Sequence, residues 1–190
     1  MICASLISRI FDPFIGFIIL FSVAGVRSGV MGWDLFRLMS ILFVTMILAP
    51  GVLLLWTVKT KRVTNWDISN RRERVRAFVV LTFFLCIDCV IMYMVGTPLM
   101  NQVFHFFLVL FAGFFLITLR LKLSGHMSTI SLIVLFLTSW YGGMFFSLYF
   151  LIPLVAWARL RLKRHTMREI LMGTVYPFCL FFLAQGLRLI

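Results

Sequence analysis

Two histidines and a glutamate stand at spacings that suit acid–base and nucleophilic chemistry. His165 and Glu169 are four residues apart, so on one helix their side chains would be neighbours. A neutral imidazole can attack phosphorus, and a nearby carboxylate can fix its tautomer. A second histidine, His126, can in its protonated form protonate a departing alkoxide. This inventory suits phosphoryl transfer.

Basic residues and a helix start near these histidines suit the binding of a phosphate group. Guanidinium groups bind phosphate oxygens in bidentate fashion without titrating, and they stabilise the charge that develops during transfer. Arg159 lies six residues before His165, and Arg74 lies in a basic segment upstream. Ser124 and Gly125, which would open a helix, can present backbone N–H groups to phosphate oxygens.

The three segments together resemble the signature of the type 2 phosphatidic acid phosphatase superfamily, which includes the vanadium haloperoxidases. The family pattern is Lys-x6-Arg-Pro, then Pro-Ser-Gly-His, then Ser-Arg-x5-His-x3-Asp. Ser124-Gly125-His126 is similar to the centre of the second motif. Arg159-x5-His165-x3-Glu169 is similar to the third motif in spacing, with Glu in place of Asp. The resemblance covers about residues 67–173.

The resemblance implies a role for each matching residue. His165 would be the nucleophile, His126 the acid on the leaving group, and Glu169 the group that orients the nucleophile. Arg159 and Arg74 would bind phosphate. No metal or other cofactor is implied.

The first motif departs from the family pattern. Asp67 stands where the family has Lys, and Val75 rather than Pro follows Arg74. Asp67, Arg71 and Arg72 are secondary candidates for the site, and for the two arginines we favour contact with lipid headgroups.

The second and third motifs each depart at one position. Leu123 replaces the Pro of the second motif, and Ala158 replaces the Ser of the third. Lys122, four residues before His126, is the candidate for the missing cation. The chain is most similar to a divergent branch of the superfamily.

These candidate residues lie between long apolar stretches, which we expect to be membrane helices. Of the 190 residues, 63% are hydrophobic, 13% are charged and 22 are Phe, which is more apolar surface than a short soluble chain can bury. We expect an all-α, polytopic transmembrane bundle of about six to seven spans, forming a single domain over residues 1–190 with its motifs in about 59–175. The apolar stretches lie near 10–26, 36–58, 77–95, 99–119, 128–157 and 170–190.

The stretch 128–157 is long for one span. The segment Trp140–Gly143 contains a Gly pair beside two interfacial aromatics, which predicts a reversal there. With that hairpin the spans number seven, the termini lie on opposite sides, and all three basic loops share one face.

The net charge of +12 is concentrated in loops between the apolar stretches. Because aromatic residues lie in the spans rather than among these cations, a nucleic-acid surface is not indicated. The positive-inside rule places the basic face in the cytoplasm, and we expect a multi-pass protein of a plasma or inner membrane. With the hairpin, that face carries fifteen cations: Arg9, Lys59, Lys61, Arg62, Arg71, Arg72, Arg74, Arg76, Arg120, Lys122, Arg159, Arg161, Lys163, Arg164 and Arg168.

Other polar groups in the spans have simpler explanations. Cys86 and Cys89 have no second Cys pair nearby and are read as buried thiols. Asp88 and His105 are functional candidates because they are ionisable groups within spans. We favour hydrogen-bonded packing for both.

Three functions remain open. The first is hydrolysis of a lipid phosphate, a phosphomonoester or diphosphate of a phospholipid or polyprenyl lipid, through a phosphohistidine. The second is phosphotransfer to another lipid at the same site, and the third is non-catalytic lipid binding or transport. A CDP-alcohol or polyprenyl transferase needs paired acidic motifs for Mg²⁺, and the chain has only six acidic residues. In each case the partners expected are a lipid phosphate and the bilayer.

Overall fold

A computed structural model describes residues 1–60 and 71–190 of the chain. Within these ranges the regular structure is helical, as expected for apolar segments that must satisfy their backbone groups internally. The elements are α1 (Ile2–Ile10), α2 (Pro13–Arg27), α3 (Gly32–Phe43), η1 (Val44–Leu48), α4 (Ala49–Lys59), α5 (Arg71–Val95), α6 (Pro98–Thr118), α7 (Gly125–Tyr141), η2 (Gly142–Phe150), α8 (Leu151–Arg161) and α9 (Met167–Gly186).

Six helical stretches in the described residues are long and apolar enough to cross a membrane. This confirms the predicted all-α, polytopic helical architecture. The stretches are 2–27, 32–57, 75–95, 98–118, 125–161 and 167–186.

The chain divides into two compact units. One comprises residues 1–20 and 121–190, and the other comprises residues 21–120. The first unit holds the residues of the second and third motifs. We call it the motif unit.

In the unit of residues 21–120, aromatic side chains pack between helices. The rings of Phe21 and Phe104 stack with centroids 4.4 Å apart, and Phe78 of α5 stacks on Phe114 of α6 at 5.3 Å. Thr97 caps the start of α6, since its hydroxyl accepts the N–H of Met100 at 3.3 Å. This is a standard N-cap, and it defines the turn between α5 and α6.

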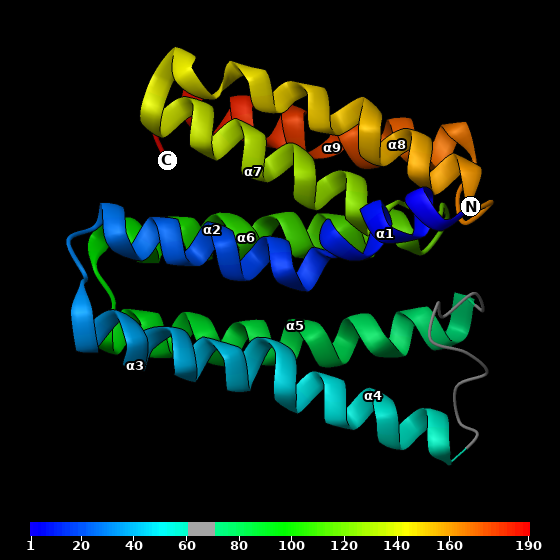
Figure 1. The fold of residues 1–190 in the computed structure, drawn as a ribbon. Coiled ribbons are helices and arrows are strands. Elements are labelled where there is room, and N and C mark those ends of the chain that lie inside the picture. The colour runs from blue at the N-terminus through cyan, green and yellow to red at the C-terminus, as the bar shows by residue number, and fades with distance from the viewer. Residues whose placement is uncertain (61–70) are drawn as a thin grey trace. The chain divides into compact units, whose positions relative to one another are not determined.

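The motif unit contains the predicted hairpin. Helix α7 ends at Tyr141, and Gly142 follows with a φ of +75°, a conformation that favours glycine. The chain then returns beside α7 through η2 and α8 (Figure 1). The 37-residue stretch 125–161 is therefore two antiparallel arms rather than one span, which confirms the reversal at Trp140–Gly143.

Helix α1 was not among the predicted elements, and it packs against α8. Ile7 and Phe11 at its C-terminal end contact a buried apolar cluster. The chain breaks after α1 because Asp12 caps α2, accepting the N–H of Phe14 at 3.0 Å, and Pro13 occupies the first turn of α2. The cluster against which α1 packs consists of Met127, Ile130, Val155 and Ile170.

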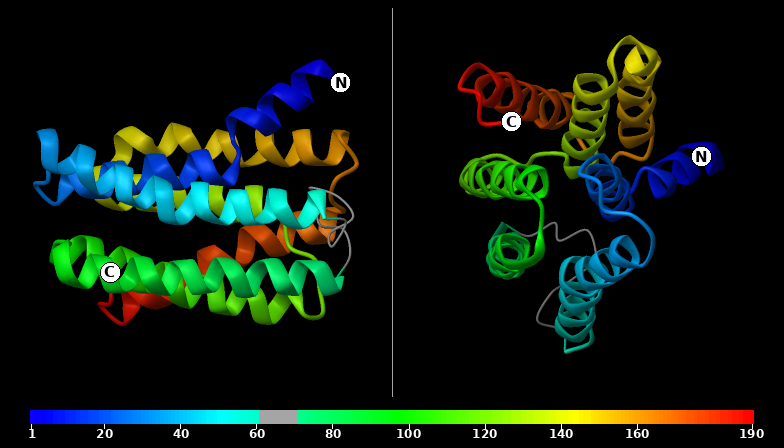
Figure 2. Two further views of the ribbon diagram at one scale, coloured as in Figure 1. Left: turned by 90° about the horizontal axis from the view of Figure 1, so that it is seen from below. Right: turned by 90° about the vertical axis from the view of Figure 1, so that its left-hand side faces the viewer.

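Helices α7 and α9 approach closely at Gly173. A Cβ atom there would lie 2.8 Å from the backbone oxygen of Ser124. The carbonyl of Gly173 accepts the hydroxyl of Ser128 at 2.8 Å. This contact holds the beginning of α9 against the beginning of α7, where the histidine motifs lie. Within the motif unit, the two chain termini lie at opposite ends (Figures 1 and 2).

Candidate active site

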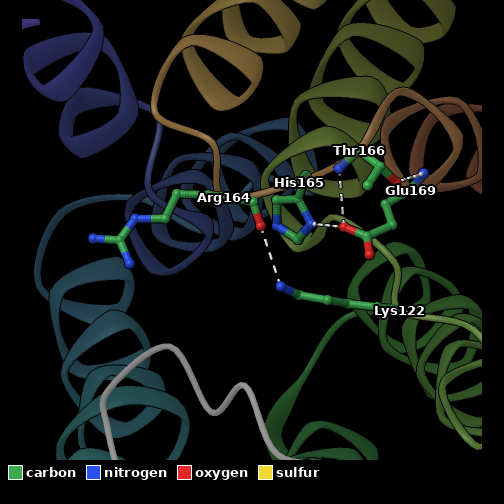
Figure 3. Close-up of polar contacts among 5 residues, drawn as sticks. All are labelled: Lys122, Arg164, His165, Thr166 and Glu169. Carbon is green, nitrogen blue, oxygen red and sulfur yellow. Dashed lines mark hydrogen bonds and ion pairs between the residues drawn. The ribbon is translucent and has the colours of Figure 1, made fainter.

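The start of α9 orients His165 through Glu169. The Nδ1 atom of His165 lies 2.8 Å from Oε2 of Glu169, and the two side chains are only 7% and 21% exposed (Figure 3). A carboxylate can only accept, so Nδ1 carries the hydrogen of a neutral ring and Nε2 keeps its lone pair. The sequence prediction that these two residues are neighbours is confirmed.

Glu169 also belongs to a capping box. Its Oε2 accepts the N–H of Thr166 at 3.2 Å, and the Thr166 hydroxyl accepts the N–H of Glu169 at 3.3 Å. This pattern satisfies two N–H groups that would otherwise have no partner at the helix start. It also fixes the carboxylate relative to the imidazole, because the same oxygen serves both.

His165 is held in its neutral form. Burial, the largest cause, lowers the pKa of its imidazole to about 4, and the positive charges of Arg159 and Lys122 act in the same direction. Glu169 opposes this shift but does not reverse it. A neutral imidazole with a free Nε2 is the state that can act as a nucleophile.

His126, at the start of α7, contacts the end of α1. Its Nε2 atom lies 3.1 Å from the backbone carbonyl oxygen of Ser8 and 3.4 Å from the Ser8 hydroxyl. It also interacts electrostatically with His165 and Arg159. The two histidines predicted to act together are therefore near enough to interact electrostatically.

Arg159, near the end of α8, is a buried cation. Only 8% of the residue is exposed, and its Nη1 donates to the Ser8 hydroxyl at 2.7 Å. Its Nε has no hydrogen-bond partner among the described residues, which leaves one donor unsatisfied. A buried guanidinium with an unused donor is suited to an anionic ligand.

Lys122 links two of the basic loops, residues 119–124 between α6 and α7 and residues 162–166 between α8 and α9. Its ammonium donates to the carbonyl oxygen of Arg164 at 3.1 Å (Figure 3). This contact confirms that these two loops share one end of the motif unit. The charge of Lys122 also acts on His165.

Ser124 and Gly125 lie at the start of α7, as predicted, but Ser124 has a different partner from the one expected. Its N–H donates to the backbone carbonyl of Glu169 at 3.3 Å, so it joins α7 to α9 rather than facing an open site. The Ser124 hydroxyl is buried and has no hydrogen-bond partner within the described ranges.

The structure describes the first-motif candidates only in part. Arg71, Arg72 and Arg74 fall in the first turn of α5, in the unit of residues 21–120, and only their backbone is described. Asp67 lies outside the described residues. Their participation in the site with the histidines stays a prediction.

Two ionisable groups within spans of the other unit have hydrogen-bond partners. Asp88 is fully buried and accepts from the hydroxyl of Thr45. His105 lies 2.6 Å through Nδ1 from the carbonyl of Asn101, but it is exposed rather than packed. The described residues form no group of three or more metal-ligating side chains.

Ser8 was not among the predicted site residues. It contacts both His126 and Arg159, although it precedes them by 118 and 151 residues. The only local signal is its place one turn before Asp12-Pro13, where a helix is expected to end. That signal does not reveal which helix the end would meet.

Comparisons with family models, curated proteins and solved structures give no match to this chain. The function is therefore argued from the residues and their geometry.

Proposed function

We propose that this protein is a membrane lipid phosphatase that hydrolyses a phosphate ester or diphosphate of a lipid through a phosphohistidine on His165. The observation that carries the proposal is the pairing of the His165 Nδ1 with Glu169 at 2.8 Å. This pairing leaves Nε2 as a buried, neutral nucleophile beside a second histidine and two cations.

The reaction has two steps. The Nε2 lone pair of His165 attacks phosphorus and the P–N bond forms. The P–O bond to the leaving group breaks as His126 gives that oxygen a proton; the leaving group is the lipid alcohol of a phosphate ester or the lipid monophosphate of a diphosphate. In the second step His126 takes a proton from water, the water oxygen bonds to phosphorus, and the P–N bond breaks. Arg159 and Lys122 would stabilise the charge on the phosphoryl oxygens.

An amphiphilic substrate suits the setting of this site. The histidines lie at the ends of helices long and apolar enough to cross a membrane, where the headgroup of a bilayer lipid would lie. Phosphatidate, phosphatidylglycerol phosphate and polyprenyl diphosphates share this chemistry. We place the site on the cytoplasmic side of the membrane because the chain's cations concentrate on that face.

The test is a phosphate-release screen over these lipids with purified full-length protein in detergent. Wild-type protein should release phosphate from at least one of them, and His165→Ala should reduce release to background. His105→Ala, a histidine in the other unit, should keep the wild-type rate. Full activity in His165→Ala would refute the proposal. Binding of a lipid phosphate without release of inorganic phosphate would instead favour a non-catalytic role. Transfer of the phosphate to a second lipid would favour phosphotransfer.

A further inference from the structure

The end of α1 meets the active site at one residue, Ser8. Ser8 is 8% exposed, and it contacts His126 through its carbonyl and hydroxyl and Arg159 through its hydroxyl. Neither of the two family motifs that the motif unit holds includes this residue. Its contacts suggest that α1 has a role in the site beyond packing on α8.

The carbonyl of Ser8 is free to accept because of the Asp12-Pro13 break. In a continuing helix it would accept the N–H of Asp12, but that N–H donates to the carbonyl of Arg9 at 3.3 Å. Pro13 has no N–H to offer. One of the carbonyls left without a partner at the end of α1 thus finds its donor in His126, at 3.1 Å.

This contact selects the tautomer of His126. A carbonyl oxygen only accepts, so the Nε2 atom 3.1 Å from it carries a hydrogen. The neutral ring therefore keeps its lone pair on Nδ1. Among the described residues nothing is hydrogen-bonded to Nδ1, so this atom is left for the substrate.

The hydroxyl of Ser8 holds Arg159. The hydroxyl accepts a hydrogen bond from Nη1 of Arg159 at 2.7 Å. Within the described residues it is the hydrogen-bond partner of this buried guanidinium. The C-terminal end of a helix also carries partial negative charge, which favours a nearby cation. The negative charge of Asp12, just beyond α1, interacts with Arg159 as well.

We propose that Ser8 is a positioning residue of the active site: its carbonyl fixes His126 with the hydrogen on Nε2, so that Nδ1 transfers the proton, and its hydroxyl holds Arg159 toward phosphate. The inference rests on the proposed phosphatase function for the roles of His126 and Arg159. In the first step the imidazolium gives its Nδ1 hydrogen to the leaving oxygen while Nε2–H stays on the Ser8 carbonyl. In the second step the Nδ1 lone pair takes the proton of water.

The tautomer is tested without any turnover. The chain has three histidines, so ¹⁵N-histidine labelling of the full-length protein gives few ring signals, and His126→Gln identifies those of His126. At mildly alkaline pH, where a free imidazole is neutral, His126 should be the Nε2–H tautomer. The Nδ1–H tautomer would overturn the assignment. Because this measurement needs no substrate, it tests the tautomer of His126 whether or not the protein releases phosphate.

The role of the hydroxyl is tested by phosphate affinity. Ser8→Ala should weaken the binding of inorganic phosphate about tenfold, as expected for the loss of one hydrogen bond to a charged group. Ser8→Thr, which keeps a hydroxyl, should bind within about threefold of wild type by the same reasoning. Ser5→Ala, one turn earlier in α1, is the matched control and should bind as wild type does. Equal phosphate affinity in Ser8→Ala and wild type would overturn the proposed role of the hydroxyl.

Discussion

The Oε2 atom of Glu169 accepts both the Nδ1–H of His165, at 2.8 Å, and the backbone N–H of Thr166, at 3.2 Å. One carboxylate oxygen therefore helps to cap the start of α9 and also orients the imidazole of His165. The backbone N–H of Thr166 holds this carboxylate in place, and the carboxylate in turn holds the ring of His165. The two roles can be separated by mutation.

Glu169→Gln should lower kcat about 100-fold or more with a smaller change in KM. The amide can still cap the helix, but it can donate to the imidazole and so no longer fixes its tautomer or balances its charge. Thr166→Ala is the control for capping alone. It should cost about 1 kcal/mol of stability and leave kcat nearly unchanged. A similar loss of kcat in both variants would mean that Glu169 acts only through the helix start.

The acid limb of the pH profile should fall near pH 4. Burial lowers the pKa of His165 to about 4, and the nucleophile is active only when unprotonated, so kcat/KM should lose its acid-side activity around that pH rather than near 6.5. The unfolded chain binds this proton more readily than the fold does, so stability should also decrease as the pH falls from about 6.5 toward 4. An acid limb near pH 6.5 that persists when His126 is replaced would contradict a buried, neutral His165.

Gly173→Ala should push the start of α9 away from the start of α7, and with it the segment of His165 away from that of His126. The added Cβ would meet the Ser124 oxygen at 2.8 Å and its nitrogen at 3.1 Å, and both belong to backbone that cannot move cheaply. We expect a loss of about 1–3 kcal/mol in stability together with at least a tenfold loss of activity. Gly186→Ala, in the same helix with open space around it, should be neutral or slightly stabilising. Equal behaviour of the two variants would refute the importance of this contact.

Arg159→Lys should weaken both binding and turnover. Lysine keeps the charge but lacks the planar fork that can hold Ser8 and phosphate together, so kcat/KM should fall about 10- to 100-fold. Arg161→Lys is the matched control, because Arg161 is exposed two residues further along α8. Retention of wild-type kcat/KM by Arg159→Lys would show that a single point charge is sufficient at this position.

The hairpin at Gly142 fixes which loops share a side of the membrane. Single cysteines placed at Arg120 and Lys163 in a cysteine-free chain should react with a membrane-impermeant reagent from the same side, and one at Arg188 from the opposite side. If residues 125–161 instead crossed the bilayer as one helix, the cysteines at Arg120 and Lys163 would react from opposite sides. A reporter fused to the C-terminus gives the absolute orientation and tests the cytoplasmic placement of the site.

Much of the fold was predictable because the bilayer imposes it. Apolar runs of the right length must be helices, and Gly142 beside interfacial aromatics marked the reversal. The pairing of His165 with Glu169 was also predictable, since residues four apart are neighbours at the start of a helix. These features depend on local sequence.

What the sequence did not reveal depends on contacts between distant segments. The meeting of Ser8 with His126 and Arg159 follows from how α1 packs on α8, and the use of the Ser124 N–H follows from the close approach of α9 at Gly173. No local pattern encodes either contact. The placement of Arg74 relative to the histidines stays a prediction.

The most direct test of the central claim is to trap the covalent intermediate. Full-length protein is mixed briefly with ³²P-labelled phosphatidate or polyprenyl diphosphate, denatured in alkali to preserve phosphohistidine, and digested for peptide mapping. We predict label on the peptide that contains His165 in wild type and in His105→Ala, and no label in His165→Ala. Release of phosphate by wild-type protein with no label at His165, or label that persists in His165→Ala, would contradict the account.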